Sequence, residues 1–435
     1  MPMFRILVLA AVVFLAPLGA PPSAAAQEDG ASLDRADSLV AAWVASGRIP
    51  GAVLLVVRDG NPVLEKAYGY ARLLEYAEGE YGASQAGESR PGALRRLADP
   101  VPMTPATVFD LASVTKVMAT TFAVMLLADR GELDVDATVS RYLPDFRGGG
   151  KNDITLRHLL THTSGLQQWV PTYYHASDAD AAYAYVRDLS LGWPVGEGRH
   201  YSDLGFMVLG RVVERIAYKP LDAFLRDELY GPLGLRDTGF RRRQAGACAS
   251  GVVPGGAGPA GPFAATSHGN PYEHRMVYDT TFGYNPTGDP HAWDGWRRYT
   301  LVGEVNDGNA WQGWEGVAGH AGLFSTAGDL SVLLQFLLDR GESGGRRWLR
   351  AETVDSFMKP VVTGQALGWQ VPGYAPAGSF THTGFTGTWV LGVPSQRLTV
   401  VLLTNRQNLG VGAKGLYPDV GALQRGVAAA LLGGP

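Results

Sequence analysis

Five apolar segments, two near the N-terminus and three near the C-terminus, have the length and spacing of β-strands. Residues 52–58 form an apolar run, Asp59-Gly60 makes a tight turn, and residues 62–67 continue as a second strand. Residues 379–384, 388–393 and 398–404 alternate or run apolar at strand length. The pattern therefore predicts strands at both ends of the chain.

Helical spacing dominates between these two groups of strands. Residues 113–128 predict a strongly apolar helix, which ends at Gly131. Residues 203–217 predict an amphipathic helix, because apolar residues recur every four positions along it. Further helices are predicted over residues 329–339 and 422–432.

Two segments show no regular period. Residues 73–100 are polar and rich in Ala, Gly and Glu, which predicts a surface insertion. Residues 246–262 contain six Gly and three Pro among 17 positions, which predicts a loop.

Strands at both ends around a helical centre predict an α/β fold with a helical insertion. We place the α/β part at about 30–130 and 320–435, and the mostly helical part at about 131–319. Length alone favours two or three domains. The arrangement instead predicts one discontinuous domain over residues 27–435.

The first 26 residues have the order of a secretory signal. Arg5 precedes an apolar run over residues 6–20, and three alanines at 24–26 offer a cleavage site. The run is short for a membrane span, and no later segment is long enough to span a membrane. We expect a periplasmic or secreted protein; an uncleaved anchor helix is the alternative.

Composition narrows the class of partner and cofactor. With 37 basic and 41 acidic residues, a net charge of -4 offers no basic face for nucleic acid. The single cysteine, Cys248, cannot form an internal disulfide. His158 and His162 are four apart, but Leu159 stands where a zinc hydrolase needs glutamate. We therefore predict no metal and no cofactor, and leave the oligomeric state open.

The pair Ser113 and Lys116 is the first candidate for catalysis. Residues three apart lie on one face of a helix, so the lysine amine is expected beside the serine hydroxyl. A lysine with a depressed pKa can activate a serine nucleophile. Ser356 and Lys359 have the same spacing, but only Lys116 lies in an otherwise uncharged stretch, where a buried charge needs a reason.

Two further segments carry candidate chemistry. Tyr201 precedes the helix at 203–217, and a tyrosine beside a lysine can shuttle a proton. Its alternative is a half-buried aromatic residue next to a capping Ser202 or Asp203. Residues 381–387 are rich in Thr and Gly, and the Phe385 amide could form an oxyanion hole with the Ser113 amide. A β-bulge is the alternative there.

Together these segments resemble the serine β-lactamase and penicillin-binding protein superfamily, most closely its class C branch and the penicillin-binding protein 4B-like peptidases and esterases. The resemblance rests on segments spread over most of the chain, at residues 108–113, 158–166, 201–203, 319–326, 367–369 and 382–384.

The resemblance implies an antiparallel sheet of N- and C-terminal strands flanked by helices. It also implies that Ser113 is acylated, that Lys116 and Tyr201 transfer protons, and that the amides of Ser113 and Phe385 bind the oxyanion. Substrate-binding roles are implied for four further residues, namely Asp203, His382, Thr383 and Gly384.

Two residues depart from the family pattern. Asp203 replaces an asparagine, and His382 replaces the lysine of the K-T-G motif. Both changes lower the positive potential where a carboxylate would bind. His320 and Asn309 are further candidates for the pocket, Asn309 in a segment that resembles an active-site loop. The alternative for His320, which lies in a Gly-rich turn, is that it satisfies local backbone groups.

The expected activity is a serine hydrolase that acts on D-aminoacyl peptides, as a D,D-carboxypeptidase does, or on small esters. The substrate would be a small molecule or a peptidoglycan fragment. A β-lactamase is one alternative, and a penicillin or cell-wall binding protein that does not hydrolyse its ligand is the other.

Overall fold

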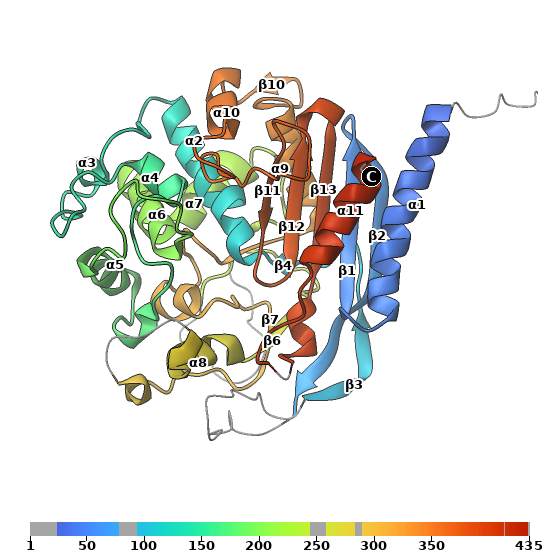
Figure 1. Ribbon diagram of the computed structural model, residues 1–435, viewed down its shortest axis with the longest axis horizontal. Helices are drawn as coiled ribbons and strands as arrows, with labels where there is room; N and C mark the ends of the chain where they lie inside the picture. The colour runs from blue at the N-terminus through green and yellow to red at the C-terminus, as the bar shows by residue number, and fades with distance from the viewer. Residues whose placement is uncertain (1–23, 78–93, 244–257, 283–288, 413, 434–435) are drawn as a thin grey trace, which may run out of the picture.

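A six-stranded sheet forms the centre of the protein (Figure 1). The computed structural model describes residues 24–77, 94–243, 258–282, 289–412 and 414–433. The strand order is β11-β12-β13-β1-β2-β3, and every neighbouring pair is antiparallel. Its strands are β1 (Gly51–Arg58), β2 (Asn61–Tyr76), β3 (Leu94–Pro102), β11 (Phe380–Thr383), β12 (Thr388–Val393) and β13 (Leu398–Thr404). The expected antiparallel sheet built from both ends of the chain is therefore confirmed.

Helices cover both faces of this sheet. Alternate residues of β1 point to opposite sides, so Leu54 and Val56 join one apolar cluster while Val53 and Leu55 join another. Helices α1 (Ala24–Ala45) and α11 (Gly421–Leu432) pack on the first face, and α9 (Ala327–Leu338) packs on the second (Figure 1). Burial on both sides explains why β1 and β13 are continuously apolar.

The middle of the chain forms the remaining helices. They are α2 (Phe122–Asp129), α3 (Val139–Tyr142), α4 (Leu156–Leu160), α5 (Ala179–Asp188), α6 (Asp203–Ala217), α7 (Leu221–Leu225), α8 (Pro271–Tyr278) and α10 (Ala351–Met358). Helix α6 has the predicted bounds, because its apolar face is continuous and Ser202 caps its first turn by accepting from the Gly205 NH.

Several elements differ from the predictions. Helix α1 was not predicted, although Ala36, Val40 and Trp43 recur at helical spacing and face the sheet. The segment at 73–100 is not simply an insertion, since β2 continues to Tyr76 and β3 begins at Leu94. Their alternating pattern is weak because most of their side chains are only partly buried.

Short strands also form outside the central sheet, and those at residues 239–240, 265–268 and 300–302 lie within the part predicted to be mostly helical, at about 131–319. The short strands are β4 (Phe109–Asp110), β5 (Gly239–Phe240), β6 (Ala265–His268), β7 (Thr300–Val302), β8 (Leu323–Ser325), β9 (Glu342–Ser343) and β10 (Arg346–Arg347). With only two to four residues each, these strands are too short to show a period. Most of the predicted loop at 246–262, with Cys248, lies outside the described residues, as do residues 1–23 of the expected signal.

One described segment, Ala112–Asp129, has the length and composition of a membrane span, contrary to our expectation that none would. Within the protein, 83% of this segment is buried. It is the core helix that carries Ser113 and Lys116.

The central sheet allows a direct test of core packing. Leu402 of β13 is fully buried, so Leu402→Ala is expected to lower the free energy of unfolding by about 2–5 kcal/mol through lost apolar burial and the cavity left behind. Leu416, which is 44% exposed, provides the control. Leu416→Ala should change stability by less than about 0.5 kcal/mol in the same urea titration, and equal losses would contradict this assignment of the core.

Candidate active site

Ser113 lies at a sharp corner between a strand and a helix. Strand β4 ends at Asp110, and Ala112 then adopts φ +46°, a conformation that residues other than glycine rarely take. Ser113 follows in a 3₁₀ turn, Ala112–Val114. A π turn, Lys116–Thr121, leads into α2, so the predicted helix at 113–128 exists but begins with two irregular turns. Such turns often mark functional sites.

The buried carboxylate of Asp110 holds this corner in place. It accepts hydrogen bonds from the backbone NH of Ala112 at 2.8 Å and of Asn306 at 2.6 Å. Burial raises the pKa of Asp110 to about 6, and the two NH donors limit that rise. Asp110 therefore connects the Ser113 turn to the loop that contains Asn306.

Lys116 is fully buried and points at Ser113. Its Nζ donates to Ser113 Oγ at 2.9 Å and to the backbone oxygen of His320 at 3.1 Å. It also forms an ion pair with Asp203, with Nζ 2.7 Å from Oδ1. The contact predicted from the spacing of Ser113 and Lys116 is therefore present, and Asp203 adds a negative partner.

This ion pair changes the protonation of the site. Burial opposes the charge of Lys116, but Asp203 and Tyr201 outweigh burial and raise the pKa of its amine. The pKa of Tyr201 is also raised, in this case by burial, although the charge of Lys116 opposes the rise. At neutral pH the resting site therefore holds a lysine ammonium and a neutral Tyr201 phenol, whereas the sequence led us to expect a lysine with a lowered pKa.

Tyr201 is positioned by the residues around the start of α6. The His162 ring lies 4.4 Å from the Tyr201 ring, and its Nδ1 accepts from the Ser202 NH at 3.0 Å. Burial and the charge of Lys116 keep the pKa of His162 well below its usual value. His158 instead caps α4 together with Thr155. Across the described ranges, no group of three or more His, Cys, Asp or Glu is arranged to hold a metal ion.

The end of β11 faces the same corner. His382 is fully buried, its Nδ1 contacts the Thr383 oxygen at 2.9 Å, and burial with the charge of Lys116 lowers its pKa to about 3. Gly384 donates its NH to the Thr388 oxygen and leaves no room for a Cβ beside the Leu111 carbonyl. This close approach explains the need for glycine at position 384.

Two backbone NH groups are available near the Ser113 hydroxyl. Ser113 lies in the first turn of its helix, where NH groups have no acceptor within the helix. The Phe385 NH has no hydrogen-bond acceptor in the part of the chain that the structure describes. The Phe385 oxygen is fixed by Arg406, which donates to it at 2.7 Å.

A pocket of about 230 Å³ opens beside Ser113. Its walls combine aromatic and polar side chains from seven segments of the chain. The lining residues are Ala112, Ser113, Gln168, Trp169, Tyr201, Asp203, Tyr272, Glu273, Met276, Asn306, Asp307, Ala321 and Phe385. No Lys or Arg is among the described residues that line this pocket.

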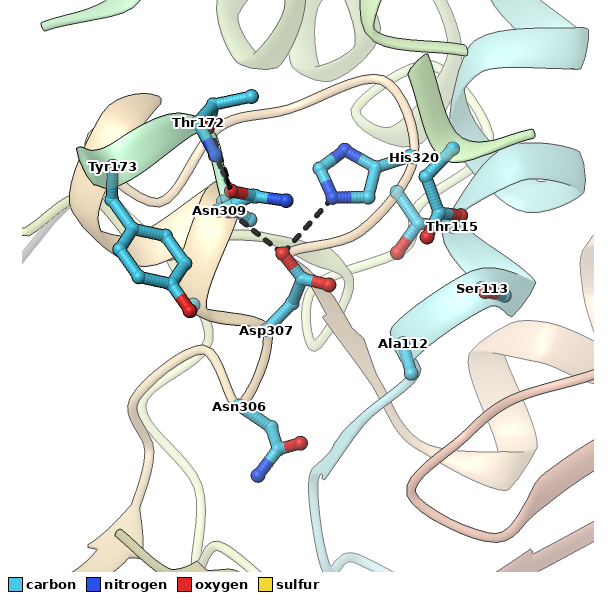
Figure 2. A network of polar contacts seen from close by, with 12 residues as sticks. Ala112, Ser113, Thr115, Thr172, Tyr173, Asn306, Asp307, Asn309 and His320 are labelled. Atoms are coloured by element: carbon cyan, nitrogen blue, oxygen red, sulfur yellow. Dashed lines mark hydrogen bonds and ion pairs between the residues drawn. The ribbon is translucent and has the colours of Figure 1, made fainter. Parts of the chain in front are cut away.

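The structure corrects two predicted pocket residues. Asn309 is fully buried and does not line the pocket; its Oδ1 accepts from the Thr172 NH at 2.7 Å and from the Thr172 hydroxyl at 2.8 Å. His320 is also buried and lies behind the wall, where its Nε2 contacts Asp307 at 3.0 Å (Figure 2). Its backbone oxygen, rather than its ring, contacts Lys116.

Glu273 and Asp307 have opposite protonation tendencies. Burial and the charge of Asp307 raise the pKa of Glu273 to about 8, so Glu273 is neutral at pH 7. Burial opposes ionisation of Asp307 as well, but His320 and the Ala310 NH keep the pKa of Asp307 below its usual value. One of the two neighbouring carboxyl groups is therefore charged and the other is not.

Comparison with known proteins decides the family. The family model described as "Beta-lactamase" matches residues 36–422. The chain belongs to the beta-lactamase family. It is a serine hydrolase of this family, with the β-lactamase and transpeptidase fold.

Three similar proteins illustrate the range within the family. The "N-acetylmuramyl-L-alanine amidase" of Bacillus subtilis (strain 168) is 34% identical over 89% of this chain and 83% of its own length. A Salmonella agona protein named D-alanyl-D-alanine carboxypeptidase is 30% identical over 90% of this chain and 87% of its own length. A class C beta lactamase from Rhodobacter sphaeroides has a TM-score of 0.58 at 20% identity, over 92% of this chain and 99% of its own.

Within this family site, the second serine and lysine pair is only a structural feature. Ser356 donates its hydroxyl to the Thr353 oxygen at 2.8 Å near the end of α10, and Lys359 is exposed. Neither residue lines the pocket beside Ser113.

Sequence reasoning missed several residues of the pocket. Trp169, Tyr272, Glu273 and Asp307 all line it, yet none was a candidate. Asp307 lies in the loop that was singled out, where Asn309 was chosen instead. The other three lie in segments with no recognised spacing to Ser113, so only the fold brings them together.

The buried carboxyl of Glu273 generates a prediction on stability. Its folded pKa of about 8 lies above the ordinary 4.5, so its stabilising contribution is fully present below pH 4.5 and is lost as the pH rises through 8. Glu273→Gln remains neutral throughout. The free energy of unfolding should therefore fall less between pH 5 and pH 9 in the variant than in the wild type, as measured by urea denaturation.

Glu352, an exposed residue in the first turn of α10, provides the control. Glu352→Gln should leave the wild-type pH dependence in place. If Glu273→Gln also left it in place, the neutral state assigned to Glu273 would be wrong.

Proposed function

We propose that this chain hydrolyses an amide of peptidoglycan origin, the bond between an N-acetylmuramyl group and L-alanine, through an acyl intermediate on Ser113. The observation that carries the proposal is the contact between Ser113 Oγ and the buried Lys116 Nζ at the mouth of a pocket with two available backbone NH groups. The amidase relative, 34% identical over most of both chains, supports the choice of bond.

The proposed acylation step uses the residues around this contact. Ser113 Oγ attacks the amide carbon, and its proton passes to the unprotonated amine of Lys116. The backbone NH groups of Ser113 and Phe385 stabilise the oxyanion. The C–N bond then breaks as Tyr201 donates its proton to the leaving nitrogen, and the Lys116 ammonium passes the proton taken from Ser113 to the Tyr201 phenolate. Water hydrolyses the Ser113 ester and regenerates the hydroxyl.

The electrostatics of the pocket favour this bond over the alternatives. Asp203 cancels the charge of Lys116, and the low pKa of His382 removes a second positive charge. A substrate with a carboxylate next to the reacting bond, as in a β-lactam or a D-alanyl-D-alanine end, meets no Lys or Arg among the described residues that line the pocket. When the L-alanine carboxyl is itself bonded to the next residue of a peptide, the muramyl amide carries no free carboxylate at that position.

A D,D-carboxypeptidase is the second candidate, since Salmonella agona relatives of that name cover a similar share of the chain. Small esters would serve as alternative acyl donors for the same Ser113. On the order of residues in the first 26 positions, we also propose that the chain acts in the periplasm or outside the cell.

Ser113→Ala is expected to abolish hydrolysis, since it removes the hydroxyl that Lys116 Nζ contacts at 2.9 Å and that would form the acyl intermediate. Purified protein would be assayed for release of L-alanine, as its carboxamide, from N-acetylmuramoyl-L-alaninamide, with a D-alanyl-D-alanine peptide and a short-chain ester in parallel. Ser356→Ala is the matched control and should retain wild-type rates. Activity that survived in Ser113→Ala would overturn the assignment of the nucleophile.

A fluorescent penicillin separates the remaining alternatives. Label that forms on Ser113 and decays fast would indicate a β-lactamase, and label that persists without any amide or ester turnover would indicate a binding protein. We expect amide turnover with little or no labelling. Faster release of D-alanine than of L-alanine would favour the carboxypeptidase.

The ion pair of Lys116 and Asp203 predicts a specific pH profile. Asp203 raises the pKa of the amine, so the unprotonated base becomes more abundant as the pH rises. Asp203→Asn removes the negative charge and lowers that pKa, so the acidic limb of kcat/KM against pH should shift to lower pH. Asp203→Glu retains the charge and should keep the limb near its wild-type position. An unshifted limb in Asp203→Asn would argue against Lys116 as the base.

A further inference from the structure

We propose that Asp307, together with the aromatic walls formed by Trp169 and Tyr272, binds a neutral hydroxylated sugar ring in the acyl half of the substrate. This inference rests on the proposed amidase function and names the part of the pocket that would select the sugar. Nothing in the family match assigns a role to these three residues.

Asp307 presents an unused acceptor to the pocket. Its Oδ1 accepts from the Ala310 NH at 2.8 Å and contacts His320 Nε2 at 3.0 Å. Its other oxygen accepts no hydrogen bond from any described residue, although the side chain is only 21% exposed. Figure 2 shows this carboxylate between its loop and the turn that carries Ala112 and Ser113. A half-used, ionised carboxylate held this rigidly is suited to accept from ligand hydroxyls.

The aromatic part of the pocket supplies a flat apolar surface. Trp169 and Tyr272 both line the pocket with Ser113, and Tyr272 packs on Phe385 with ring centroids 4.8 Å apart. A sugar ring has apolar C–H faces and a rim of hydroxyl groups. Aromatic faces beside a few polar groups therefore match both parts of such a ligand.

The charges around the pocket favour a neutral ligand over an ammonium or a carboxylate. Asp203 is paired with Lys116 at 2.7 Å, and Glu273 accepts from the Gly308 NH and contacts the Tyr173 hydroxyl. Glu273 therefore has both oxygens occupied and Asp203 is paired with a cation, whereas one oxygen of Asp307 has no hydrogen-bond donor among the described residues. Hydroxyl groups can use that oxygen without a full charge being moved out of water.

The position of this surface relative to the nucleophile is fixed by one residue. Asp110 accepts from the NH of Ala112 and from the NH of Asn306, the neighbours of Ser113 and Asp307 respectively. The carboxylate of Asp110 is buried and ties the two segments together. A ring bound at Asp307 would thus be held at a set distance from the Ser113 hydroxyl, as acyl transfer requires.

The test measures binding without turnover, in full-length protein carrying Ser113→Ala. The two probes are N-acetylmuramoyl-L-alanine and D-lactoyl-L-alanine, which contains the same amide without the sugar. Calorimetry should show the sugar-containing probe binding at least about tenfold more tightly. Adding Asp307→Asn, which is isosteric, should remove most of that difference by replacing the free acceptor with a donor.

Two further variants keep the test decisive. Trp169→Leu removes part of the aromatic surface without touching the contacts of Asp307, and should also weaken the sugar-containing probe more than the lactoyl probe. Asp294, which is 75% exposed and pairs with Arg298, is the matched control, so Asp294→Asn should bind both probes as the parent does.

Equal affinity for both probes in the parent protein would overturn the sugar site. A second result would also contradict the sugar site. In that result, D-alanyl-L-alanine, which carries an ammonium, would bind more tightly than the muramyl probe, and Asp307→Asn would weaken its binding more. Because these measurements use Ser113→Ala, they stand apart from the proposed reaction. Preferential binding of the sugar with no amide turnover in the wild type would instead refute the proposed function alone.

Discussion

A lysine ammonium with no exposed surface lies where the two parts of this fold meet, and the site is organised around its need for partners. Lys116 contacts the Ser113 hydroxyl, the Asp203 carboxylate and the His320 carbonyl. These partners come from the start of the core helix, from α6 and from the turn before β8. A buried charge without such partners would be strongly unfavourable. The same contacts that compensate the charge therefore bring the reacting groups together.

The two departures from the family pattern act on that charge. Aspartate at 203 turns a polar neighbour of Lys116 into an ion-pair partner and raises the pKa of the amine. Histidine at 382 is buried and its lowered pKa keeps it neutral at pH 7, so this position adds no second positive charge to that of Lys116. The machinery for forming an acyl-serine is thus present, while the positive potential that would hold a substrate carboxylate is absent. The family resemblance indicates the type of reaction, and Asp203 and His382 would affect which substrate binds.

The part of the pocket around Glu273 and Asp307 differs in charge from the surroundings of Lys116. Its carboxyl groups are neutral or partly occupied by backbone and side-chain donors, and its apolar surface is aromatic. Asp110 connects this part of the pocket to the nucleophile through two backbone NH groups. A single buried carboxylate therefore couples the position of the reacting hydroxyl to the part of the pocket that would recognise the ligand.

The local pattern of apolar residues was sufficient to predict a helix or strand wherever that element had a clear apolar face or run of its own. The helix at 203–217 and the strands at 388–393 and 398–404 have the predicted bounds, since each has a continuous apolar face or run and a clear end. The contact of Ser113 with Lys116 follows from three-residue spacing on a helix. By contrast, β3 and the two-residue strands have no period of their own and exist because partner strands complete their hydrogen bonds.

The pocket, like these short strands, depends on contacts between distant segments of the chain. Asn309 and Asp307 are two residues apart and equally polar, yet the fold turns one toward Thr172 and the other toward Ser113 (Figure 2). Glu273 is neutral only because burial and Asp307 make it so. Residue types and spacings thus identified the contact between Ser113 and Lys116, because the two residues are three positions apart in one helical segment. Substrate recognition was decided by tertiary structure, because its groups meet across long stretches of chain and take their charge from where they are buried.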